Sequence, residues 1–134
     1  LGVPVIAYAQ DSLPAFWSAT SPLPAPLRLD DADGIARAHL MRAALGLPGG
    51  QLIANPIPLA DEIPYDEIAP IITHAIDVAD AQGITGKALT PFLLDRIHQL
   101  TGGRSLEANI SLVRNNARLA AKIANRITTL SQNA

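Results

Sequence analysis

The pattern of apolar and polar positions predicts short buried strands that alternate with amphipathic helices. Residues 3–8 are almost continuously apolar and rich in β-branched side chains, which is typical of a strand buried on both faces of a parallel sheet. A second apolar run at 51–57 follows a diglycine and predicts another strand. We therefore expect an α/β protein with three layers, in which helices cover both faces of a mostly parallel or mixed sheet. Only part of that sheet would lie in this chain.

Two helices are predicted in the first two thirds of the chain. Asp30 or Asp31 can cap a helix that runs to about Leu45, with Gly46 directly after it. Apolar positions spaced by threes and fours predict a second helix over 65–82, and Gly83 ends it.

Two further helices are predicted to meet at a corner. Thr90-Pro91 is a strong start signal, with threonine at the N-cap and proline at the first helical position, and this helix runs to Leu100. Ser105 is predicted to cap the final helix after the glycines at 102 and 103. Because so few residues separate the two helices, we expect Asn109 to lie close to their junction.

The final helix is predicted to lie on the core through one apolar face. At about 100° per residue, Asn109 and Asn116 project onto the middle of that face, where an amide without partners costs about 1–3 kcal/mol. They either bond to backbone groups of a neighbouring strand or loop, or lie in a polar pocket where Asn109 points at a ligand. The predicted apolar face carries Leu106, Ile110, Val113, Ala117, Ala120, Ala124 and Ile127, and the solvated face carries Glu107, Ser111, Arg114, Arg118, Lys122 and Asn125.

A proline-rich segment at 10–26 holds two large aromatic side chains, Phe16 and Trp17. Such a loop either packs over the body of the protein or lies against a partner. We favour the packed arrangement.

Hydrophobic content, net charge and the lack of cysteine exclude several classes of function. With 49% hydrophobic and only 16% charged residues, the surface is expected to dock onto more protein. The net charge of −2 offers no electrostatic footprint for nucleic acid or an anionic membrane. The absence of cysteine excludes disulfides and a cysteine nucleophile and is compatible with a cytoplasmic setting. The charge-free stretch 43–60 is interrupted by glycines and prolines and predicts no membrane span.

Few residues offer direct chemistry. Asn55 follows the second predicted strand, where open α/β sheets place their ligands, although a simple strand-ending turn explains it equally well. His39, His74 and His98 are too widely spaced to predict a metal site. A nucleotide-binding glycine loop between a strand and a helix is absent.

Four stretches, in their order and spacing, resemble the pseudouridine-5′-phosphate glycosidases, also called the indigoidine synthase A-like family. The resemblance covers almost the whole chain. The stretches are Gly2-Val-Pro-Val with Asp11 and Pro14-Ala-Phe-Trp; Gly49-Gly50 with Ala54-Asn-Pro-Ile-Pro; Gly83-Ile84 and Gly86-Lys87 with Thr90-Pro-Phe-Leu-Leu; and Leu100-Thr-Gly-Gly-Arg-Ser-Leu with Ala108-Asn-Ile, Leu112-Val and Asn115-Asn116-Ala.

The resemblance implies an enzyme that reversibly cleaves the carbon–carbon glycosidic bond of pseudouridine 5′-phosphate to uracil and ribose 5-phosphate. It implies a lysine Schiff-base mechanism, a divalent metal, typically Mn²⁺, and a homo-oligomer, expected to be a trimer. Residues 1–134 would be the carboxyl-terminal portion of a single α/β glycosidase domain. The catalytic lysine and the metal ligands would belong to an amino-terminal half outside this chain, which begins on Leu1 as if cut from something longer.

The resemblance also assigns site residues. Asn109 matches an active-site asparagine of the family and is expected to be catalytic. Asn55, Lys87, Thr90 and Asn116 match family motif positions and are expected to contact substrate, with Lys87 not the nucleophile. The other hypothesis is a structural or interaction module, without catalysis, that docks through its apolar surface.

Overall fold

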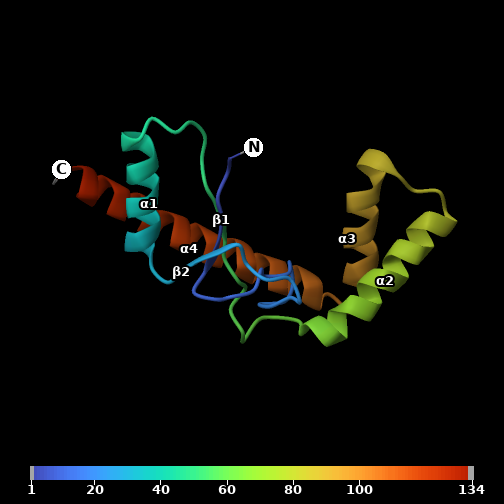
Figure 1. Cartoon of the computed structure of the whole chain (residues 1–134). Helices are drawn as coiled ribbons and strands as arrows, with labels where there is room; N and C mark the ends of the chain where they lie inside the picture. The colour runs from blue at the N-terminus through green and yellow to red at the C-terminus, as the bar shows by residue number, and fades with distance from the viewer. Residues whose placement is uncertain (1, 133–134) are drawn as a thin grey trace.

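The computed structural model describes residues 2–132, which form a small parallel sheet and four α-helices (Figure 1). In chain order the elements are β1 (Val5–Tyr8), β2 (Leu27–Leu29), α1 (Ala32–Ala44), β3 (Leu52–Ala54), α2 (Tyr65–Ala81), the short 3₁₀ helix η1 (Gly86–Ala88), α3 (Leu89–Leu100) and α4 (Arg104–Gln132).

The three strands lie in the order β2-β1-β3, and both neighbours of β1 are parallel to it. Ile6 and Ala7 of this central strand are buried, as expected for a strand covered on both sides. The α/β class and the parallel sheet predicted from the sequence are thus confirmed. The predicted strand at 51–57 is shorter, because pairing stops before Pro56, which has no backbone N–H to donate.

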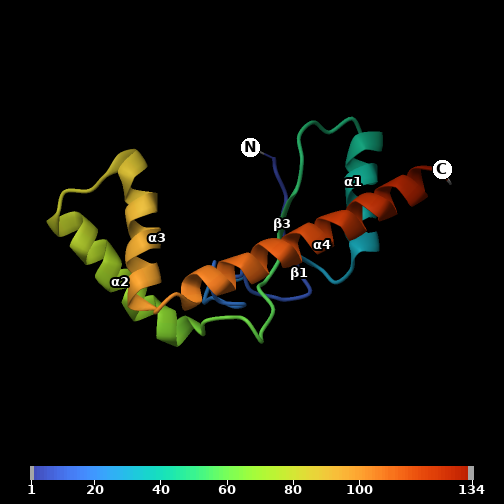
Figure 2. The same cartoon turned by 180° about the vertical axis from the view of Figure 1, so that it is seen from behind.

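Helix α4 is the axis of the molecule. It passes behind the strands in Figure 1 and in front of them in the reverse view of Figure 2, so it covers one face of the sheet. Helix α1 packs near the carboxyl end of α4, and the α2–α3 hairpin lies at the opposite end, next to the start of α4. Among the described residues, no helix combines the length and apolar character needed to cross a membrane.

The face of α4 that packs against the chain is not the predicted one. Ala108, Leu112 and Leu119 are buried, whereas Leu106 and Val113 of the predicted apolar face are 51% and 58% exposed. The packed face looked mixed in the sequence because it includes Asn115 and Arg126. These polar side chains are satisfied by partners far along the chain: Asn115 donates to the Pro56 carbonyl over 2.9 Å, and Arg126 pairs with Asp33.

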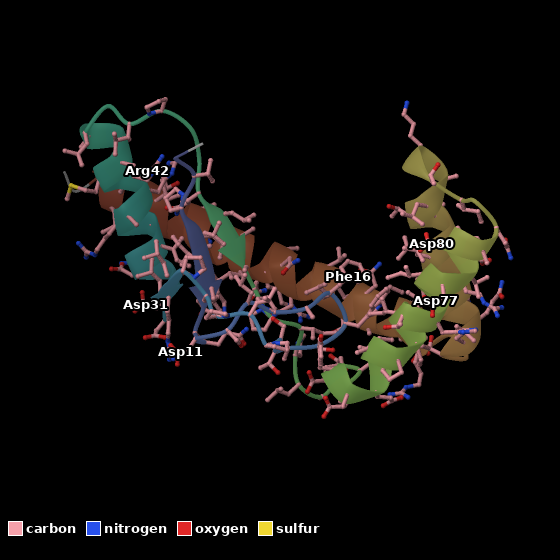
Figure 3. The ribbon with its side chains drawn as sticks, turned by 45° about the vertical axis from the view of Figure 1, so that its right-hand side comes forward. Asp11, Phe16, Asp31, Arg42, Asp77 and Asp80 are labelled. Atoms are coloured by element: carbon pink, nitrogen blue, oxygen red, sulfur yellow. The ribbon has the colours of Figure 1, made fainter. Side chains whose placement is uncertain are left out.

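The proline-rich loop packs onto the body of the protein, as favoured from the sequence. Trp17 and Ala19 are buried in the main apolar cluster together with residues of α2, α3 and α4, and the polar Ser18 between them is also buried. Two hydrogen bonds hold the loop to Ile63. The Ile63 N–H donates to the Trp17 carbonyl over 2.8 Å, and the Ser18 hydroxyl donates to the Ile63 carbonyl over 2.6 Å. Phe16 stays 48% exposed and lies beside the first half of α4 (Figure 3).

The predicted helix starts are correct for α1 and wrong for α3 and α4. Asp31 caps α1 by accepting from Gly34 N–H over 2.7 Å. Thr90 lies inside α3, which begins at Leu89 directly after η1, two residues before the predicted first helical position.

Ser105 lies inside α4, and Thr101 takes the capping role that was expected of Ser105. The Thr101 hydroxyl accepts from Ser105 N–H over 3.2 Å. Gly102 and Gly103 have φ of 59° and 92°, which lets the chain turn sharply between the two helices.

Candidate functional site

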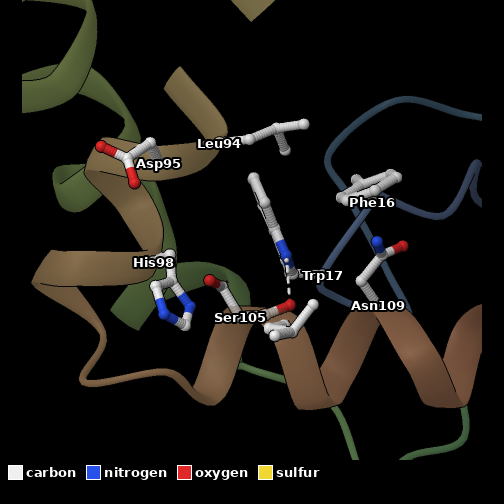
Figure 4. Close-up of a pocket in the computed structure, with 8 residues that line it drawn as sticks. Phe16, Trp17, Leu94, Asp95, His98, Ser105 and Asn109 are labelled. Carbon is white, nitrogen blue, oxygen red and sulfur yellow. Dashed lines mark hydrogen bonds between the residues drawn. The ribbon is translucent and has the colours of Figure 1, made fainter. Parts of the chain in front are cut away.

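The helical corner and the aromatic loop enclose a pocket of about 210 Å³ around Asn109 (Figure 4). Three segments distant in sequence supply its walls: the loop, the second half of α3 and the first turns of α4. The lining residues are Phe16, Trp17, Leu94, Asp95, His98, Ser105, Leu106 and Asn109.

Trp17 fixes the loop to α4. Its indole Nε1–H donates to the Ser105 carbonyl over 3.0 Å, and only 8% of the residue is exposed. The Phe16 ring stands edge-on to the indole, with 4.8 Å between ring centroids and an interplanar angle of 88°. One wall of the pocket is therefore a pre-built aromatic corner, held in place by a buried hydrogen bond.

Asn109 brings an unpaired amide to this apolar setting. It is partly buried, and among the described residues no side-chain hydrogen bond involves its amide. In Figure 4 the amide projects from α4 toward Phe16, at the mouth between the loop and the helix. An amide with one acceptor and two donors can bind a ligand group of complementary pattern here. The sequence left open a backbone partner or a pocket for Asn109, and the geometry places it in a pocket.

Asn55 and Asn116 form a pair outside this pocket. Asn55 Nδ2 donates to Asn116 Oδ1 over 3.0 Å, which joins the carboxyl end of β3 to the middle of α4. Asn116 is thus hydrogen-bonded to a side chain, and not to a backbone group of a neighbouring strand or loop as one of the two sequence-based alternatives expected. Because each amide keeps unused hydrogen-bonding capacity and both residues are accessible, the pair can also contact a ligand.

Lys87 and Thr90 lie at the far end of α3 from Asn109. Both are exposed, at η1 and in the first turn of α3. The pocket instead uses the second half of this 12-residue helix, which is about 18 Å long at the standard rise. The structure therefore does not bring Lys87 and Thr90 to Asn109 within this chain, and their expected role in substrate binding stays a prediction.

An ion pair between Arg104 and Glu67 links the start of α4 to α2 near the corner of α3 and α4. Arg104, the first residue of α4, donates to Glu67 of α2, which holds the two helices together and raises the pKa of Arg104 above its ordinary value. Within residues 2–132, no group of three or more histidine, aspartate or glutamate side chains is arranged to hold a metal ion. The side chains of residues 2–132 therefore provide no ligand set for a Mn²⁺ ion.

Sequence reasoning missed most of the pocket walls. Phe16 and Trp17 were expected to pack on the body of the protein or to lie against a partner, and His98 was considered only as a metal ligand, which its spacing disfavoured. A helical spacing could have pointed to the wall on α3, since Leu94 and His98 are four residues apart and share one face. The sequence does not show that this face of α3 lies next to Asn109, because that depends on the angle between α3 and α4.

Comparison with known proteins places the chain in context. The profile of the family described as indigoidine synthase A like protein matches residues 1–126. A pseudouridine-5′-phosphate glycosidase of Roseobacter denitrificans is 67% identical over 123 residues, which cover 92% of this chain and 40% of the relative. One of a Jannaschia species is 62% identical over 129 residues, covering 96% of this chain and 43% of the relative. The chain thus spans about two fifths of the curated relatives it matches.

Two crystal structures share the fold. The prealnumycin C-glycosynthase AlnA, in complex with ribulose 5-phosphate, superposes with a TM-score of 0.89 at 29% identity over 99% of this chain and 44% of that one. An indigoidine synthase A-like protein from Thermotoga maritima gives a TM-score of 0.78 at 30% identity, over 91% of this chain and 40% of that one.

Proposed function

The chain belongs to the indigoidine synthase A-like family, and we propose that it forms part of a pseudouridine-5′-phosphate glycosidase. The observation that carries this proposal is the 62–67% identity to relatives of that name across nearly the whole chain. The chain matches about two fifths of each relative, so the rest of the enzyme would supply the remainder of the site.

The proposed reaction is reversible cleavage of the carbon–carbon bond between uracil and ribose 5-phosphate. A lysine outside residues 1–134 would form a Schiff base with the opened ribose. The uracil carbon would take up a proton as the carbon–carbon bond breaks, and water would hydrolyse the Schiff base to release ribose 5-phosphate. AlnA gives indirect support, because its name also denotes carbon-glycoside chemistry and it was crystallised with a pentulose 5-phosphate. Because phosphate esters are charged and do not cross membranes unaided, we propose that the enzyme acts in the cytoplasm. Its assembly as a homotrimer remains a prediction.

In this proposal, the pocket at the helical corner receives the base. Uracil presents carbonyl oxygens on either side of an N–H group, and the Asn109 amide offers both a donor and an acceptor to such an edge. Trp17, Leu94 and Leu106 would form apolar walls beside the base. Asn109 would then hold the departing base in place while the bond to the sugar breaks.

Manganese would be held elsewhere in the whole enzyme. When bound, such an ion would supply charge stabilisation beside the phosphate. Since the described residues offer no fitting ligand set, no step assigned to this chain passes through a metal.

A chimaera tests the proposal. The matched segment of the Roseobacter denitrificans relative is replaced by this chain, and release of uracil from pseudouridine 5′-phosphate is followed by absorbance. We expect the chimaera to keep turnover within about tenfold of the parent enzyme, and the isolated 134-residue chain to show none. A folded but inactive chimaera beside an active parent would refute the proposal, as would turnover by the isolated chain that Asn109→Ala abolishes.

A further inference from the structure

Helix α4 carries a second apolar face that nothing in residues 2–132 covers. Leu106, Ile110 and Val113 are 51%, 45% and 58% exposed, although they are large apolar side chains on one side of the helix. Alanines continue this face toward the carboxyl end of α4. We call the set the α4 stripe; it consists of Leu106, Ile110, Val113, Ala117, Ala120 and Ala124.

The α4 stripe is separate from the surfaces that α4 already uses. The packed face of Ala108, Leu112 and Leu119 is turned about 140°, roughly two fifths of a turn, away at 100° per residue. The polar face lies on the other side, where Ser111 donates to Asp61 over 2.5 Å. A row of exposed apolar side chains this regular on a helix is typical of a surface that another element covers.

The sheet also has uncovered sides. Strands β2 and β3 are its two outer strands among the described residues, and Leu27 and Leu52 on them are 52% and 56% exposed. Parallel sheets are normally enclosed by further strands and helices. The open sheet edges and the α4 stripe therefore both indicate that additional chain covers this part of the protein.

The relatives carry additional chain that could cover these surfaces. Relatives that are 62–67% identical carry more than half of their length beyond the matched segment. AlnA retains the fold of this chain at a TM-score of 0.89 inside a chain of which the match covers only 44%. We propose that the α4 stripe is the docking surface for the remaining part of the same family domain.

The position of the stripe gives this interface a consequence for the site. Leu106 belongs both to the stripe and to the pocket wall, and Asn109 lies next to the stripe on α4. The docked part thus closes over the mouth of the pocket beside Asn109. This inference rests on family membership and on exposed apolar surface, and it holds whatever substrate the whole enzyme uses.

The test is association, measured without substrate. This chain, carrying an affinity tag, is co-expressed with the unmatched part of the Roseobacter denitrificans relative, and the amount of that part that co-purifies is quantified. Val113→Glu puts a charge into the stripe, while the control Arg114→Glu changes the neighbouring residue on the polar face. Both side chains are exposed, so circular dichroism should show both variants folded.

We expect the unmatched part to co-purify with the unaltered chain and with Arg114→Glu, and at least tenfold less of it with Val113→Glu. Equal recovery with Val113→Glu would overturn the proposal. So would a chain that binds only itself through the stripe, seen as a dimer by light scattering that Val113→Glu dissociates.

A second measurement covers the case in which the unmatched part does not accumulate alone. Glutamate is placed in the whole Roseobacter relative at the positions aligned with Val113 and, separately, Arg114. The first should lower the melting temperature by several degrees and the second should not; equal melting temperatures contradict the proposal. A complex that forms but cannot cleave pseudouridine 5′-phosphate would refute the proposed function and leave the docking surface standing.

Discussion

Replacement of Trp17 by phenylalanine should loosen the wall of the pocket and destabilise the whole chain. The substitution removes the indole N–H that donates to the Ser105 carbonyl over 3.0 Å, a loss of about 0.5–1.5 kcal/mol. It also leaves space in the main apolar cluster, where the residue is only 8% exposed. Removing part of a buried aromatic ring adds about 1 kcal/mol, a fraction of the 3–5 kcal/mol of a full truncation to alanine. The expected total is about 2 kcal/mol.

The assay is urea unfolding followed by circular dichroism at 222 nm, because the chain has one tryptophan and the variant has none. For a denaturant slope of about 1–3 kcal/mol/M, the midpoint should fall by about 1 M. Tyr65→Phe is the matched control, since Tyr65 is 40% exposed and its loss of one hydroxyl should move the midpoint little. A Trp17→Phe midpoint equal to that of the control would refute the role of Trp17 as the anchor of the loop.

Three further substitutions test other contacts. Asp31→Ala removes the cap of α1 and should cost about 0.5–2 kcal/mol in urea unfolding; an unchanged midpoint would contradict the cap. Ser18→Ala leaves the Ile63 carbonyl without its buried donor and should cost about 1–3 kcal/mol, whereas a neutral result would show that water replaces the bond. Arg126 and a second arginine hold the pKa of Asp33 below its ordinary value. Their stabilisation is therefore full above about pH 4 and lost as pH falls through the lowered pKa, so Asp33→Asn should lower the urea midpoint at pH 7 and lower it less at an acidic pH near or below that pKa. Equal effects at the two pH values would show that charge is not the cause.

The sequence predicted those helices and strands whose signals lie within a few neighbouring residues. The apolar run at 3–8 and the cap at Asp31 needed only neighbouring residues, and both proved correct. Strand β2 was missed because Leu27–Leu29 is three residues long and follows a proline-rich loop. Such a strand is fixed by pairing with β1 rather than by its own pattern.

The face of α4 could not be predicted from periodicity. The helix has two apolar faces, and the choice between them depends on where Asp33 and Pro56 lie in space to satisfy Arg126 and Asn115. The more apolar face, which includes Val113, is exposed, and under the docking proposal its partner lies outside the described residues. Projection at 100° per residue finds apolar faces but cannot assign their partners.

The candidate site was predictable only in part. Asn109 stood out as an amide among apolar positions, and the structure places it in a pocket. Its aromatic wall, Phe16 and Trp17, lies about ninety residues earlier in the chain, and no short-range pattern links the loop to α4. Lys87 and Thr90, which match family motif positions, lie away from this pocket within the chain, and their expected contact with substrate stays a prediction.

The most direct test of the account is the turnover of the chimaera with and without the Asn109 amide. Asn125→Ala is the matched control, because Asn125 is an exposed asparagine on the same helix and lies outside the pocket. If Asn109 holds the base, Asn109→Ala should lower kcat/KM for pseudouridine 5′-phosphate at least tenfold, with an unchanged melting temperature, while Asn125→Ala stays within about twofold. Equal kcat/KM values for the two variants would contradict the central claim that this chain contributes Asn109 to the active site.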